Sequence, residues 1–197
     1  GAWAQFPAFA KANSIDIDKI KVEPVGFPTR EPMLAEGKVD SVTGFSFSSY
    51  LNLVRLGVPE DDITTILMAD HGLQLYGNAV IANTDFAKSN PDIVKKFLSA
   101  VGSGWKDAIK SPKTAAAALV KRNPAADAVL EQRRLQLAIN ANVLTNYVKA
   151  NGMGRIDKDR FALAIKQLGE TYDYKTAPDA KLYFTGAYLP DGGISLQ

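Results

Sequence analysis

The chain has no cysteine and a single histidine, His71. Without cysteine there are no disulfides, thiolate nucleophiles, iron–sulfur clusters or thiolate zinc sites. A single histidine also excludes a metal site built on two histidines and a histidine-rich catalytic centre. We therefore expect no metal and no redox cofactor.

Long apolar runs and a surplus of one charge are also missing. The apolar stretch Ala115 to Val120 is far shorter than the roughly 20 residues that a membrane helix needs. Basic residues number 23 and acidic residues 21, so we expect no nucleic-acid partner. With 46% apolar and 22% charged residues, the composition is that of an ordinary soluble globular protein.

Short apolar segments alternate with helical segments in the first third of the chain. Thr29 is a candidate N-cap, and Gly37 and Gly57 are typical helix stops. Strands separated by helices indicate parallel βαβ units, so the predicted fold class is α/β. The predicted strands are Ile20 to Val25, Val39 to Thr43, Ile63 to Ala69 and Asn78 to Ala82.

The chain begins in the middle of this alternation. A helix is predicted over Gln5 to Asn13, with Phe6 and Phe9 on one face, but no strand precedes it. A secretory signal is also absent from the first ten residues. We therefore expect the sequence to be a fragment that lacks an N-terminal part.

Helices dominate after Ala82. The pairs Asn90–Pro91, Ser111–Pro112 and Asn123–Pro124 each place a capping residue before a proline, which is typical of a helix start. A long helix is predicted from Ala125 to Lys149 and another from Asp157, followed by an irregular tail. The C-terminal half is thus predicted to be helical.

Catalytic motifs are absent. The sequence has no nucleophile elbow, phosphate loop or dinucleotide fingerprint, so we expect no catalytic residues and no cofactor. Ligands of open α/β sheets lie beyond the carboxyl ends of strands, near helix N-termini. Aromatic and hydroxyl side chains at such places suit a small organic ligand. The candidate binding residues are Ala2, Trp3, Phe45, Ser46, His71 and Tyr76.

Each candidate also has a structural interpretation. Trp3 would fit in the core, and Ser46 would fit as a helix cap. At least one of Phe45 and Phe47 is expected to lie in the core. His71 would also serve as a turn residue, and Tyr76 as a packing residue at a hinge.

Three segments resemble one protein family. The stretch from Phe27 to Val42, with Ala35 to Ser41 as its hallmark, resembles the substrate-binding proteins of ABC importers for nitrate, sulfonates, taurine and thiamin precursors, the NMT1/THI5-like family. The segments Tyr76 to Asn83 and Asn90 to Leu98 resemble the strand and helix that follow in that family.

The resemblance implies a two-lobe, type II periplasmic-binding architecture. Residues 1–73 would form most of the second lobe, 74–77 the hinge and 78–197 the returning part of the first lobe. A small organic ligand, anionic, aromatic or sulfonate-like, would bind between the lobes and be delivered to an ABC-importer permease. The expected protein is a monomer and is periplasmic or extracytoplasmic. Arg30 would attract an anion or be a structural arginine.

Two other functions stay open. Fungal relatives make the thiamin pyrimidine with a histidine and a cysteine-rich segment, and the absence of cysteine here argues against that enzyme. A ligand-sensing regulatory module with the same fold is the other alternative. We expect a binding protein rather than an enzyme.

Overall fold

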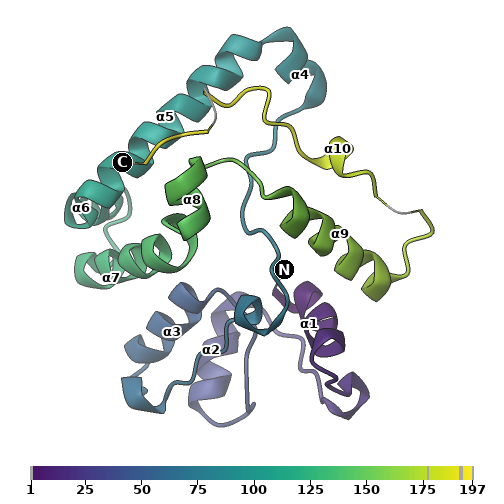
Figure 1. Ribbon diagram of the computed structural model, residues 1–197. Coiled ribbons are helices and arrows are strands. Elements are labelled where there is room, and N and C mark those ends of the chain that lie inside the picture. Colours follow the sequence, from purple (N-terminus) through teal and green to yellow (C-terminus); the bar gives the residue numbers. More distant parts are fainter. Residues whose placement is uncertain (1, 177, 191–192, 197) are drawn as a thin grey trace. The chain divides into compact units, whose positions relative to one another are not determined.

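The computed structural model describes residues 2–176, 178–190 and 193–196 (Figure 1). Contact clustering divides the chain into two compact units. Unit 1 comprises Gly1–Leu75 and Ala162–Pro178, and unit 2 comprises Tyr76–Phe161 and Asp179–Gln197. The boundary after Leu75 falls within the segment 74–77, while the assignment of lobes and a hinge stays a prediction.

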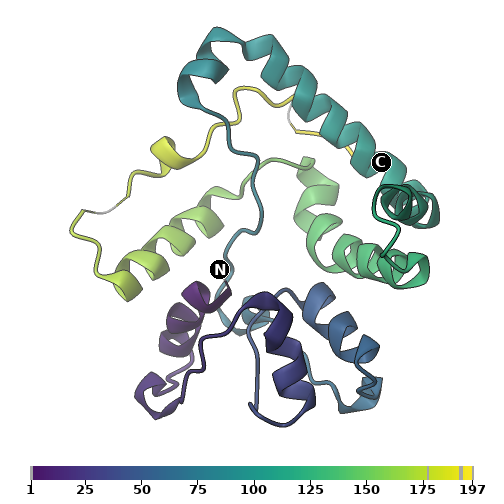
Figure 2. The same ribbon diagram turned by 180° about the vertical axis from the view of Figure 1, so that it is seen from behind.

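The predicted α/β fold class is wrong. Within the described residues the regular structure is helical, neither view shows a strand, and the only β pairing is an isolated bridge between Met153 and Ile194 (Figures 1 and 2). The sheet of the expected two-lobe architecture, with its parallel βαβ units, is therefore not present in this part of the chain.

The segments predicted as strands are extended but have no partners. Ile63, for example, has φ −102° and ψ 109°, yet no backbone ladder joins these segments among the described residues. None of their apolar side chains is fully buried, and the exposed fraction reaches 64% at Ile66 and 91% at Ile81. Alternating apolar residues favour an extended backbone, but a strand also needs a neighbour for its N–H and C=O groups.

Unit 1 is built from short helices around a small core. Its elements are η1 (Ala2–Gln5), α1 (Phe6–Ala12), η2 (Ile17–Lys19), α2 (Phe27–Ala35), α3 (Ser46–Arg55), η3 (Glu60–Asp62), η4 (Met68–His71) and most of α9 (Lys158–Tyr172). The buried apolar residues are Ala8, Ala10, Leu51, Leu53, Leu73 and Ala164. Lys11 Nζ donates to the Glu170 carbonyl at 2.9 Å, and Tyr172 Oη donates to the Ala4 carbonyl. These bonds hold α1 and η1, respectively, against α9.

Glycines follow two helices of unit 1, as predicted. Gly37 after α2 has φ +67° and Gly57 after α3 has φ +88°, a region in which glycine has no steric penalty. The N-cap predicted at Thr29 is wrong, because α2 begins two residues earlier with Pro28 in its first turn. Proline is tolerated there because the first N–H groups of a helix have no partner within the helix.

Unit 2 contains the longer helices. Its elements are α4 (Thr84–Ser89), α5 (Pro91–Lys110), α6 (Pro112–Arg122), α7 (Ala128–Ala138), the π-helical turn η5 (Ile139–Val143), α8 (Asn146–Asn151), the start of α9 and α10 (Ala180–Tyr183). Two of the proline-marked starts are confirmed, at α5 and α6. The third is wrong, because Asp127 caps α7 by accepting from the Leu130 N–H at 2.8 Å. The helix predicted to reach Lys149 is interrupted by η5.

The C-terminal segment packs on α5 at a glycine. Ile194 exchanges backbone hydrogen bonds of 2.8 and 2.9 Å with Met153 and is buried. A β-carbon at Gly102 would lie 2.3 Å from Cγ2 of Ile194, whereas one at Gly104 would meet nothing within 4 Å. The side chain of Ile194 thus occupies space that only a glycine in α5 leaves open.

This pair of glycines yields opposite expected effects. Gly104→Ala should raise the free energy of unfolding by about 1 kcal/mol, the helix-propensity difference between the two residues. Gly102→Ala should lower it by about 1 kcal/mol, because overpacking costs about 1–3 kcal/mol and outweighs that gain. Urea denaturation followed by far-ultraviolet circular dichroism measures both changes. Stabilisation by both substitutions would contradict the packing of Ile194 on α5.

Candidate functional site

Two of the predicted binding residues belong to one row of rings in unit 1. Trp3 stacks on Phe6 with centroids 5.0 Å apart, and Phe6 lies 5.9 Å from Phe9. Phe9 in turn meets the His71 ring edge-on at 6.3 Å. We call Trp3, Phe6, Phe9 and His71 the aromatic row. Trp3 is 39% exposed, so one end of the row faces solvent.

Phe6 and Phe9 were missed as site residues, although the sequence contains their signal. Residues three apart on a helix are neighbours, and the spacing of Trp3, Phe6 and Phe9 is three throughout. No local pattern predicts His71 beside Phe9, because that contact joins η4 to α1, which are far apart in the chain.

The turn that carries His71 is held from two sides. Asn13 Nδ2 donates to the His71 carbonyl at 2.9 Å, and Gln167 Nε2 donates to the Gly72 carbonyl at 2.7 Å. Gly72 has φ +87°, which lets the chain reverse after η4. Gln167 Oε1 is buried without a partner among the described residues. The backbone beside the imidazole is thus anchored to α1 and α9.

Phe45 and Ser46 lie at the start of α3. Phe45 is the N-cap residue, is 50% exposed, and stacks on Phe47 with centroids 5.3 Å apart and an interplanar angle of 18°. The expectation that at least one of these rings lies in the core is wrong, because Phe45 is exposed and Phe47 is only half-buried. Ser46 is the first residue of α3 rather than its cap.

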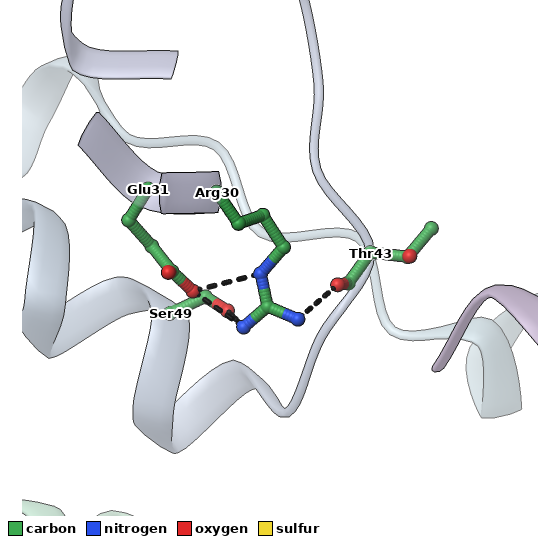
Figure 3. Close-up of polar contacts among 4 residues, drawn as sticks. All are labelled: Arg30, Glu31, Thr43 and Ser49. Atoms are coloured by element: carbon green, nitrogen blue, oxygen red, sulfur yellow. Dashed lines mark hydrogen bonds and ion pairs between the residues drawn. The ribbon is translucent and has the colours of Figure 1, made fainter. Parts of the chain in front are cut away.

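A buried polar cluster lies beneath this turn, formed by Arg30, Glu31, Thr43 and Ser49 (Figure 3). We call it the Arg30 cluster. Arg30 bonds Glu31 Oε1 through Nη2 at 2.5 Å and through Nε at 3.0 Å. Its Nη1 donates to the Thr43 carbonyl at 2.7 Å, and Nη2 also donates to Ser49 Oγ at 3.1 Å. The cluster therefore ties α2 to the residues on both sides of the turn.

Burial makes the charges of this cluster interdependent. The side chain of Glu31 is 3% exposed and that of Arg30 is 15% exposed. Burial alone would raise the pKa of Glu31, but hydrogen bonds from Arg30, Ser49 and the Glu31 backbone, together with the charge of Arg30, lower the pKa below its ordinary value. Glu31 thus stays a carboxylate and balances the guanidinium.

Tyr76 and Ala2 are placed differently from the other candidates. Tyr76 belongs to unit 2, where its hydroxyl oxygen accepts from the Asp157 N–H at 2.8 Å. Its ring lies under the Arg160 guanidinium at 4.5 Å and edge-on to Phe161. Ala2 begins η1, and Gly1 lies outside the described residues. The role of all six candidates in ligand binding stays a prediction.

The described part of the chain contains neither a metal-binding group nor a membrane-spanning helix. In residues 2–176, 178–190 and 193–196, no three His, Cys, Asp or Glu side chains gather closely enough to hold a metal ion. None of the helices in those ranges combines the length and apolarity that crossing a membrane requires.

Comparison with known protein families gave a match. The family model described as NMT1/THI5 like matches residues 2–115, which is more than half of the chain. The matched range includes the aromatic row, the Arg30 cluster and Tyr76. No curated protein matches the chain significantly.

Proposed function

Because the chain belongs to the NMT1/THI5-like family, which includes ABC substrate-binding proteins, we propose that it is the solute-binding protein of an ABC importer. In this role it captures a small organic ligand outside the cytoplasm and delivers it to a membrane permease. The proposed ligand is anionic, aromatic or sulfonate-like.

The observation that carries this proposal is the pair of exposed, supported aromatic faces in unit 1. Trp3 and Phe45 are 39% and 50% exposed, and each stacks on a neighbouring ring. Aromatic faces held by packing supply contact area at little cost in side-chain entropy. The Ser46 hydroxyl at the start of α3 adds a hydrogen-bonding group beside Phe45.

We further propose that the protein binds its ligand without converting it. The sequence has no cysteine and one histidine, which leaves few side chains suited to nucleophilic or general acid–base catalysis at neutral pH. His71 is an exposed residue of η4 that touches Phe9 at the ring edge. Its proposed role is a contact surface at the end of the aromatic row.

The test is calorimetric titration of the full chain with three probes: benzoate, taurine and 4-aminopyrimidine. We expect at least one probe to bind. Trp3→Ala and Phe45→Ala should each weaken that binding about tenfold, because a stacked aromatic contributes about 0.5–1.5 kcal/mol beyond the area that it buries.

Phe97→Ala is the matched control for these substitutions. Phe97 lies on α5 of unit 2 and is 54% exposed, close to the value for Phe45. Its replacement should leave the affinity unchanged. Absence of binding for all three probes would overturn the proposal, and so would an equal loss of affinity in Phe97→Ala.

A further inference from the structure

Most N–H donors of Arg30 already bond to other groups of the protein. A guanidinium has five N–H donors, and the Arg30 cluster contains four hydrogen bonds from it: two to Glu31, one to Thr43 and one to Ser49. Its positive charge is balanced by the buried carboxylate of Glu31. A ligand acid group would have to displace that carboxylate, so the cluster is poorly suited to receive an anion.

The bonds of Arg30 instead bracket the turn before α3. Thr43 precedes the N-cap residue Phe45 by two positions, and Ser49 follows it by four. Between them, Gly44 lies against the guanidinium: a β-carbon there would be 2.9 Å from Arg30 Nη2. The Phe27 ring lies 5.4 Å from Arg30 Cζ. The guanidinium therefore packs closely against the same backbone segment that its hydrogen bonds hold in place.

From this arrangement we propose that Arg30 is a positioning residue, which fixes the segment from Thr43 to Ser46 so that Phe45 and Ser46 face the ligand. The proposal rests on the proposed function for the ligand, and on the Arg30 cluster alone for the fixing of the segment. Lysine cannot replace arginine here, because one ammonium cannot reach Glu31, Thr43 and Ser49 in the planar fork geometry of a guanidinium.

The first part of the test needs no ligand. Fluorine NMR of the full chain labelled with para-fluorophenylalanine reports the nine phenylalanines, and the spectrum of Phe45→Leu identifies the Phe45 signal. Arg30→Lys should shift or broaden the Phe45 and Phe47 signals and leave that of Phe97 in place. Ser49→Ala removes only the hydrogen bonds of the Ser49 hydroxyl, to Arg30 and Glu31, and should give a smaller change of the same kind. This variant covers the case in which Arg30→Lys does not fold. An unchanged Phe45 signal in Ser49→Ala and in any folded Arg30→Lys would overturn the proposal.

The second part uses whichever of benzoate, taurine and 4-aminopyrimidine binds. Arg30→Lys should weaken binding about tenfold, and Ser49→Ala takes its place if the lysine variant does not fold. Either substitution should have little further effect when Phe45 is already alanine, because both changes remove the same ligand contact. Additive losses would overturn the proposal and make Arg30 a direct ligand contact. If no probe binds the unmodified chain while the Phe45 signal still moves, the proposed function fails and the fixing of the segment by Arg30 stands.

Discussion

Replacing Glu31 with alanine should lower the free energy of unfolding of unit 1 by about 3 kcal/mol, since removal of one partner leaves the other charge buried and unpaired. The side chain of Arg30 is only 15% exposed, so water cannot fully replace the lost carboxylate. The measurement is urea denaturation followed by Trp3 fluorescence in a Trp105→Phe background. These are the two tryptophans of the chain, and they lie in different units.

Glu36→Ala is the matched control for this prediction. Glu36 pairs with Lys38 at 2.5 Å, but the two side chains are 55% and 62% exposed. An exposed ion pair contributes about 0–1 kcal/mol, so this control should change stability little. Equal losses in Glu31→Ala and Glu36→Ala would contradict the importance of burial for the Arg30 cluster.

The dependence on pH supplies a second check on Glu31. Its pKa is lower in the folded protein than the ordinary value of 4.5, so folding favours the ionised form. The stabilisation is therefore fully present above pH 4.5 and is lost as the pH falls through the folded-state pKa. The stability of Glu31→Gln should fall less over that range than the stability of the unmodified chain. Parallel curves would show that Glu31 is not held as a carboxylate.

Gly44→Ala should lower the free energy of unfolding by about 1–3 kcal/mol, the usual cost of overpacking. A β-carbon at Gly44 would lie 2.3 Å from Ser49 Oγ and 3.0 Å from Arg30 Cζ. Ser49 is buried, which leaves its short side chain little room to move away. The same urea denaturation in the Trp105→Phe background measures the loss.

Gly77→Ala is the control for Gly44. Gly77 has nothing within 4 Å of its β-position and does not have a positive φ. Its replacement should change stability by less than about 0.5 kcal/mol, as surface substitutions usually do. If Gly44→Ala proved as mild as this control, the close contact of the Gly44 backbone with the Arg30 cluster would be disproved.

Local signals in the sequence predicted the helices better than the sheet. Proline and glycine restrict the backbone directly, so Pro91 and Pro112 marked two helix starts, and Gly37 and Gly57 marked two helix ends. A strand depends on a second segment, which alternation within one segment cannot supply. This is why Ile63 to Leu67 is extended yet unpaired among the described residues.

The candidate site shows the same division between local and distant information. The ring spacing from Trp3 to Phe9 is visible in the sequence, because helix geometry brings residues three apart together. The partners of Arg30 are not visible in this way. Thr43 and Ser49 lie 13 and 19 positions further along the chain. The contact at Thr43 is made by a backbone carbonyl, which every residue has, so the residue type at that position does not predict it.

The use of a carbonyl at Thr43 has a consequence for how this region tolerates sequence change. Every residue presents a carbonyl, so many side chains are acceptable at position 43. Positions 30, 31 and 49 contribute side-chain atoms, and position 44 has no room for a β-carbon. A library of variants should therefore accept varied residues at position 43 but few at positions 30, 31, 44 and 49. Under the proposed function, the affinity of the turn for new ligands is best altered at positions 45 and 46, whose side chains make no contact in the Arg30 cluster.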